Sequence, residues 1–162
     1  VGTIRYGQAS CSYGSEGVDR KGIFGYGNSD GTAAESVTNL VSNTGVVSAD
    51  VTGVGSARWY IAACEYGDDK GIFGYGKNGG FTAVTNLVSN VGVVATDTTG
   101  VGTARQNLGA CAYGGDKGIF GYGATGGGAV SMTNLVTTAG VVGTDVTGVG
   151  TARAELAACS YN

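Results

Sequence analysis

The chain has 162 residues, of which 33 are glycine and none is proline or histidine, and its formal net charge is −3. The absence of histidine excludes histidine-based acid–base catalysis, Ser-His-Asp and Cys-His nucleophile systems and histidine metal ligands. Lysine and arginine form no cluster, so we expect no general attraction to nucleic acid. No apolar run approaches the ~18–20 residues that cross a bilayer, so we expect no membrane span.

Two phrases recur along the chain and define its period. The phrase KGIFGYG occurs at 21–27, 70–76 and 117–123, and a second phrase, VTGVGSAR at 51–58, recurs twice with small changes. Such self-similarity is the signature of a repeat architecture. Alignment on the arginines predicts one continuous repeat domain, with repeats at 1–53, 54–100 and 101–148 and the first strand of an incomplete fourth repeat at 149–162.

Four strands are expected in each repeat. In the third repeat, the first two are expected at 107–113 and 118–123 and are joined by a tight Gly-Gly-Asp turn at 114–116, which predicts a hairpin. The third strand is expected at 132–136. The fourth strand of the second repeat is expected at 92–96, where Asp97 ends it.

Residue types within these segments favour strands over helices. In the second strand, period-2 alternation places Ile119 and the glycines on one face and Phe120 and Tyr122 on the other. Helix is the competing interpretation for 33–43 and 129–139. Threonine, valine and asparagine dominate there and glycine follows closely, so we expect an all-β chain.

The four cysteines recur in one phrase, in which a small residue precedes and a tyrosine follows. An even number raises the possibility of disulfides. Equivalent positions in successive repeats usually point the same way, however, so we expect four buried free thiols that act as small hydrophobic side chains. A zinc site is not expected, because no Cys-x-x-Cys spacing occurs. The residues are Cys11, Cys64, Cys111 and Cys159.

The order of these motifs resembles the kelch repeat. In that family an arginine precedes a small-residue strand, an aliphatic-aromatic strand ending in glycines, a third strand and a short outer strand. Arg105, the strand with Gly109 and Ala110, residues 119–123 and residues 132–136 occupy those places in that order. The family's adjacent glycines are Gly-Tyr-Gly in this chain, and its late tryptophan is missing. The resemblance implies propeller-like blades that bind through loops, and the KGIFGYG wording is similar to that of repeat proteins of marine tailed phages.

The number of repeats predicts that these repeats assemble with further repeats, in the same chain or in other copies. Propellers typically close with about 4–8 blades, so three repeats are expected to be a segment of something longer or to assemble with other copies. The unpaired edge of residues 149–162 is expected to join the sheet of another chain and form a homo-oligomer. A β-solenoid is the competing architecture, but its coils are usually shorter than this period of about 47 residues.

Several polar residues recur and are expected to serve the architecture. An aspartate stands eight residues before each later arginine, where it either forms an ion pair or turn cap, or binds a ligand or Ca²⁺; no Asp-x-Asp-x-Asp-Gly loop supports a calcium site. An asparagine recurs in each Thr-Asn-Leu and either bonds neighbouring backbone or contacts a sugar hydroxyl. These residues are Asp50, Asp97, Asp145, Asn39, Asn86 and Asn134.

The loop after the second strand differs in every repeat, which makes it the expected binding region. Two aromatic residues at the start of the second repeat and one in its loop also break the repeated pattern, and they could stack on sugars or fill a pocket in a partner. The candidate binding residues are Asn28, Asp30, Trp59, Tyr60, Lys77, Asn78 and Phe81.

Three functions are therefore compared. The favoured one is a non-enzymatic structural or interaction protein in an extracellular or virion appendage, with no cofactor, no metal and no catalytic residue. A lectin-like propeller that binds a surface glycan is the alternative to a module that binds a protein receptor. An enzyme is third, because Glu35, Glu65 and Glu155 are scattered and form no carboxylate pair.

Overall fold

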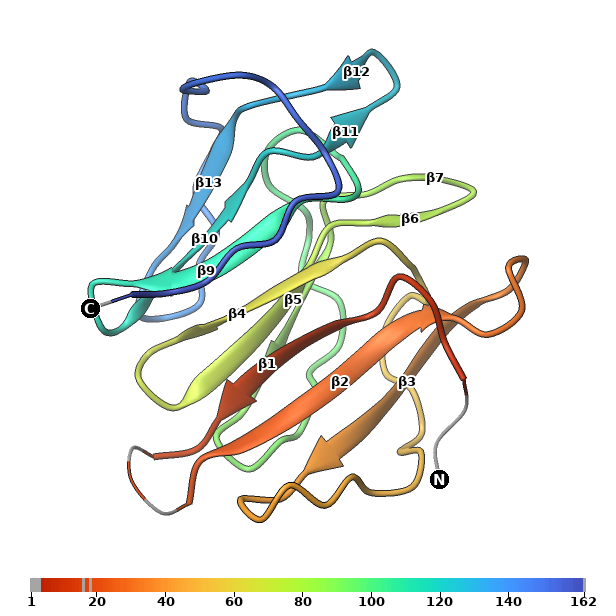
Figure 1. The fold of residues 1–162 in the computed structure, drawn as a ribbon, viewed down its shortest axis with the longest axis vertical. Coiled ribbons are helices and arrows are strands. Elements are labelled where there is room, and N and C mark those ends of the chain that lie inside the picture. The colour runs from red at the N-terminus through yellow and green to blue at the C-terminus, as the bar shows by residue number, and fades with distance from the viewer. Residues whose placement is uncertain (1–3, 16, 18, 162) are drawn as a thin grey trace.

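The structure is a computed structural model that describes residues 4–15, 17 and 19–161 (Figure 1). The expectation of an all-β chain is confirmed. The described part of the chain contains no helix, so it has no helix long and apolar enough to cross a bilayer. Its longer strands form three three-stranded antiparallel sheets. Sheet I contains β1 (Ala9–Tyr13), β2 (Lys21–Asn28) and β3 (Ala34–Val41); sheet II contains β4 (Ala62–Tyr66), β5 (Lys70–Gly74) and β8 (Thr85–Val88); sheet III contains β9 (Gly109–Tyr113), β10 (Lys117–Gly121) and β13 (Thr133–Val136).

Two short hairpins project from the loops after the second strands of sheets II and III. They pair β6 (Lys77–Asn78) with β7 (Gly80–Phe81), and β11 (Ala124–Thr125) with β12 (Gly128–Ala129). In sheet I the corresponding residues extend β2 and β3 themselves, which are eight residues long. The loops that vary in sequence therefore also vary in structure.

The second strand is the centre of each sheet. In sheet II, Ile72 on β5 lies opposite Cys64 on β4 and Leu87 on β8. Directly opposed residues share one face of a sheet. Ile72 is fully buried on this face, which packs against sheet III.

The alternation expected in the second strand fails at its tyrosine. Phe73 turns toward sheet I, and strict alternation would send Tyr75 the same way, but Tyr75 contacts Phe120 of sheet III. The three equivalent tyrosines adopt left-handed backbone, with φ of 62°, 63° and 62° at Tyr26, Tyr75 and Tyr122. This conformation reverses the side on which the ring lies, at a cost of about 1–2 kcal/mol.

The fourth strand of each repeat is only partly formed. Residues 46–51 meet β3 through two isolated bridges, Val41 with Val47 and Thr38 with Val51, and the other two sheets repeat this pattern. The asparagine of the third strand interrupts the ladder, because the Asn39 side-chain amide donates to the Ser48 carbonyl. In sheets I, II and III, this asparagine therefore bonds backbone, which was one of the two roles expected for it.

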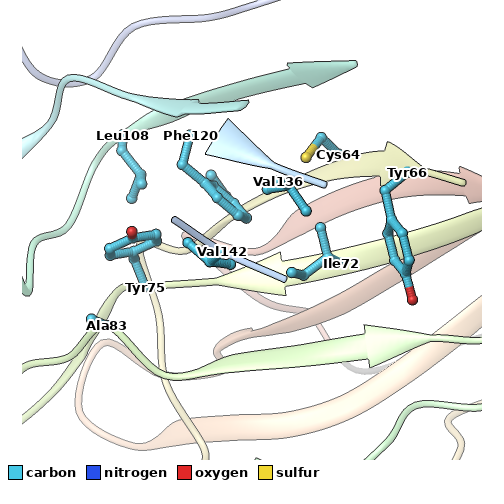
Figure 2. Close-up of a cluster of buried hydrophobic side chains, with 10 residues drawn as sticks. Cys64, Tyr66, Ile72, Tyr75, Ala83, Leu108, Phe120, Val136 and Val142 are labelled. Atoms are coloured by element: carbon cyan, nitrogen blue, oxygen red, sulfur yellow. The ribbon is translucent and has the colours of Figure 1, made fainter. Parts of the chain in front are cut away.

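The core lies between neighbouring sheets. Figure 2 shows the cluster between sheets II and III, where Ile72, Tyr75, Phe120 and Val136 meet, and a matching cluster lies between sheets I and II. The phenylalanine of each later sheet packs on a glycine of the sheet before it. A Cβ added at Gly25 would lie 2.8 Å from the Phe73 ring, and one at Gly74 would lie 2.7 Å from Phe120.

The first strands lie side by side. Figure 1 shows β1, β4 and β9 in sequence, with the C-terminal residues 154–161 running next to β9. A chain of backbone hydrogen bonds links residues before or at the start of these segments: Tyr60 N–H donates to the Gly7 carbonyl, Asn107 N–H to Tyr60 and Glu155 N–H to Asn107, at 2.8–3.0 Å. Residues 154–161 are not paired as a strand, and the described residues do not close into a ring.

Candidate functional site: a surface cluster beside the contacts between sheets

A buried arginine joins sheets I and II. Arg58 is completely buried, and its guanidinium carbon lies 4.5 Å from the centre of the Tyr26 ring in sheet I. Its Nε donates to the Tyr75 carbonyl at 3.0 Å, and its Nη2 donates to Asn86 Oδ1 at 2.5 Å, both in sheet II. One cation thus contacts an aromatic face in one sheet and bonds the next sheet.

The same contact recurs along the chain. Arg105 lies 4.3 Å from the Tyr75 ring and Arg153 lies 4.3 Å from the Tyr122 ring. Arg5 differs, because no tyrosine ring among the described residues lies against it. Its guanidinium donates instead to the Val37 carbonyl at 2.7 Å, and its buried Nε has no hydrogen-bond partner.

The recurring aspartates anchor the segment that precedes each arginine. Asp97 accepts hydrogen bonds from the Ser56 amide and hydroxyl and lies 3.8 Å from Arg58. Partial burial raises the pKa of Asp97, but hydrogen bonds from Ser56 and Asn86 outweigh this effect and hold the pKa below its usual value. Asp145 makes the equivalent bonds to Thr103. Of the roles considered, both aspartates act as turn caps, and Asp97 also forms an ion pair with Arg58.

The cysteines were expected to be buried, which is correct only for Cys64. All four are free, but Cys11 and Cys111 are half-buried and Cys159 is exposed. The Cys11 and Cys64 sulfurs pack over Gly71 and Gly118 of the following sheet. Cys111 and Cys159 have no such sheet above them among the described residues. Burial raises the pKa of Cys64 to about 12 and also raises that of Cys11.

Three of the candidate binding residues form one surface cluster. Trp59 and Tyr60 stack with their ring centres 4.8 Å apart, and Lys77 Nζ lies 5.3 Å from the centre of the Trp59 ring. Backbone hydrogen bonds of 3.0–3.1 Å between Trp59 and Lys77 hold the two segments together. All three residues are only partly buried, so the structure brings an aromatic pair and a cation together at the surface.

Two further candidates lie at the adjacent β6–β7 hairpin. Asn78 is exposed, and Phe81 retains 40% of its surface exposure. With Ser56, Arg58 and Thr82, they line a hollow of about 320 Å³. The hairpin therefore presents one aromatic ring and one amide to solvent.

The first-repeat candidates behave differently. Asn28 was expected to be an exposed loop residue, but it is fully buried, because its backbone pairs with Tyr6 and its side-chain oxygen caps the turn at Gly31. Asp30 is exposed, and its Oδ1 accepts bonds from the amides of Thr32 and Ala33 at 2.8 and 2.9 Å. These bonds lower the pKa of Asp30. Neither residue contributes to the Trp59 cluster.

The described residues contain no group of three or more Cys, Asp or Glu side chains arranged to hold a metal ion.

A larger hollow, which was not predicted from the sequence, lies on the outer face of sheet III. It has a volume of about 540 Å³ and is lined mainly by apolar groups, including Gly121, Tyr122, Leu156 and Tyr161. The recurrence of Phe and Gly in the second strands was the signal that could have located it.

Comparisons with known proteins give a likeness of fold. No family model matches the chain, and no curated protein matches it. Among solved structures, one described as the structure of YjhT superposes with a TM-score of 0.64 at 16% sequence identity. The match covers 87% of this chain and 44% of the YjhT chain, so this chain spans less than half the length of that protein.

Proposed function

We propose that this chain is a non-enzymatic structural and interaction module. Its sheets act as kelch-like propeller blades in an extracellular or virion appendage, phage tail-like in character. The module associates with other copies of itself and binds partners through its variable loops. The stacking of sheets face to face, with their first strands side by side, supports the blade arrangement.

This proposal rests on the contacts that the repeated side chains make between neighbouring sheets. Arg58 and Arg105 contact one sheet and bond the next, and Asp97 and Asp145 anchor the segments before those arginines. The repeated polar groups thus serve packing between sheets. Phe24 and Tyr113, on the outer sides of sheets I and III, remain 37% and 39% exposed, which supports association.

The proposal is tested by measuring the molar mass of the full chain. Light scattering coupled to size exclusion, from micromolar to millimolar concentration, is expected to show a mass that rises to at least twice that of one chain. A single-chain mass over the whole range would contradict the proposal. Sedimentation equilibrium at two salt concentrations provides a second measurement. If the interface is apolar, the association constant should change little between them.

A lectin-like glycan-binding propeller is the second candidate, and the Trp59–Tyr60 stack favours it. Sugars bind proteins by stacking on aromatic rings, and Phe81 supplies another exposed ring nearby. Since Tyr60 already stacks on Trp59, a sugar would bind the remaining surface of the pair. Glycan-array binding that Trp59→Ala abolishes and Tyr161→Ala preserves would favour the lectin. An array without any signal would favour the interaction module.

A further inference from the structure

We infer that the turn of the β6–β7 hairpin is a site of spontaneous covalent modification, at which Asn78 deamidates through a cyclic imide. This inference goes beyond the proposed function, since the reaction needs no enzyme and no partner. It rests on three observations: the residue that follows Asn78, the exposure of the turn, and the freedom of the two reacting groups. No other asparagine among the described residues combines all three.

The first observation is the residue that follows the asparagine. Asn78 precedes Gly79, and it is the only asparagine in the sequence that is followed by a glycine. In the reaction, the backbone nitrogen of the following residue must reach the side-chain carbonyl carbon of the asparagine, and a side chain on that residue hinders the approach. Glycine presents no such obstacle and has the widest choice of backbone conformations. Asn-Gly is also the pair that tight hairpin turns favour.

The second observation is that the turn projects into solvent. Asn78 and Gly79 are both exposed. A Cβ added at Gly79 or at Gly80 would meet no atom within 4 Å, so the backbone around the reacting bond has room to move. Figure 1 shows the β6–β7 hairpin extending away from sheet II. Water, which the reaction consumes, therefore reaches the turn freely.

The third observation concerns the two reacting groups themselves. The Asn78 side chain and the Gly79 N–H form no hydrogen bond within the part of the chain that the structure describes. Asn90, an exposed turn asparagine of the same repeat, differs in both respects. Its Nδ2 donates to Asp69 Oδ2 at 3.0 Å, and the branched Val91 follows it. Asn78 therefore lacks the bonds that would hold its amide away from the backbone.

The reaction balances with water as its only co-reactant. The Gly79 backbone nitrogen loses its proton to solvent and bonds to the Asn78 side-chain carbonyl carbon. The bond from that carbon to the amide nitrogen breaks, and ammonia leaves with a proton from solvent. Water then opens the cyclic imide at either carbonyl. Hydrolysis at the side-chain carbonyl gives aspartate, whereas hydrolysis at the backbone carbonyl gives isoaspartate, in which the main chain runs through the former side chain.

Either product changes the chemistry of the hairpin. A neutral amide that donates and accepts hydrogen bonds becomes a carboxylate that only accepts them, and the formal net charge of −3 becomes more negative by one. The new charge follows Lys77 in the sequence and lies on the lining of the hollow to which Arg58 and Phe81 also contribute. Isoaspartate also lengthens the backbone at Asn78, which pairs with Gly80 across the hairpin. The reaction therefore alters the charge and the shape of a variable loop and leaves the sheets unchanged.

Peptide mapping by mass spectrometry tests the inference on the full chain during incubation in mildly alkaline buffer. The mass change for replacement of NH₂ by OH should appear first at Asn78, in two chromatographically distinct peptides of equal mass, one for each product. Isoelectric focusing should show a new acidic species that Asn78→Gln abolishes and with which Asn78→Asp comigrates. The matched control, Asn90→Gln, should leave that species unchanged, because Asn90 is exposed but bonded to Asp69.

A synthetic peptide of residues 74–84 supplies the reference rate for a turn without the fold around it. Asn78 in the folded chain is expected to react at a rate close to that of the peptide. A much slower reaction in the folded chain, or one that begins at Asn43 or Asn90, would show that the inference is wrong. Either result leaves the proposed function in place, because the molar mass that tests self-association does not depend on the amide of Asn78.

Discussion

The Phe73 ring meets the Tyr26 ring edge-on, with centroids 5.2 Å apart and an interplanar angle of 64°. Phe120 and Tyr75 repeat this geometry at 5.2 Å and 63°. The left-handed conformation of each tyrosine makes the contact possible, and the tyrosine hydroxyls donate to Val54 and Val101 carbonyls at 3.1 Å. The local backbone cost is therefore offset by packing that exists only between two sheets.

Gly25→Ala should destabilise the chain by about 1–3 kcal/mol, since the new methyl group would overlap the buried Phe73 ring. Thermal or urea unfolding measures this loss. Gly80→Ala is the matched control, because its Cβ would meet nothing within 4 Å and Gly80 does not require a positive φ. Equal stability for the two variants would contradict the packing described for Phe73.

Arg58→Met should cost about 2–4 kcal/mol, because it leaves the Asn86 side-chain oxygen and the Tyr75 carbonyl without their donor in a buried site. Chemical denaturation provides the measurement. Arg20→Met removes an arginine whose side chain is 43% exposed and which pairs with Glu65 at the surface, so its effect should stay within about 1 kcal/mol. A neutral Arg58→Met would show that this contact contributes no stability.

Acid should destabilise the chain in a defined pH range. The folded-state pKa values of Asp97 and Asp145 lie below the usual value of 3.8. Their contribution to the free energy of unfolding is therefore fully present above pH 3.8 and is lost as the pH falls through the lower folded-state pKa. The melting temperature should therefore drop below about pH 4. Asp97→Asn should flatten this drop, and an unchanged slope would be evidence against the anchoring role.

The cysteines should react with a thiol reagent in a fixed order. At mildly alkaline pH, Cys159 should react first because it is exposed, and the half-buried Cys111 and Cys11 more slowly. Cys64 should react only after unfolding, because it is buried and its burial raises the pKa of its thiol. Time-resolved labelling with peptide mapping assigns each rate. Fast labelling of Cys64 in the folded chain would contradict its packing over Gly118.

The all-β class could be predicted from residue types and spacing. Glycine recurs where a phenylalanine of the next sheet must fit, so packing itself imposes the period that the sequence displays. The side on which Tyr26 lies could not be predicted, because its left-handed backbone depends on contacts with Phe73 and Arg58 from another sheet. Local alternation contains no information about such contacts.

The candidate site was predicted in part. Trp59, Tyr60 and Lys77 meet, and all were selected because they depart from the repeated pattern. Asn28 was selected for the same reason but is buried, since variation in sequence does not distinguish an exposed loop from an extended strand. The hollow on the outer face of sheet III was missed, because a residue that repeats looks structural.

One backbone conformation carries four different side chains at a repeated position. The position is occupied by residues linked by backbone hydrogen bonds: Gly7, Tyr60, Asn107 and Glu155. All four residues share a left-handed conformation, with φ between 54° and 61°, yet their side chains are a hydrogen, a phenol, an amide and a carboxylate. The scaffold therefore tolerates very different functional groups at one repeated point beside the first strands. New side chains can therefore be placed at the positions of Tyr60, Asn107 and Glu155, whereas a Cβ added at Gly7 would lie 2.8 Å from the Tyr60 ring.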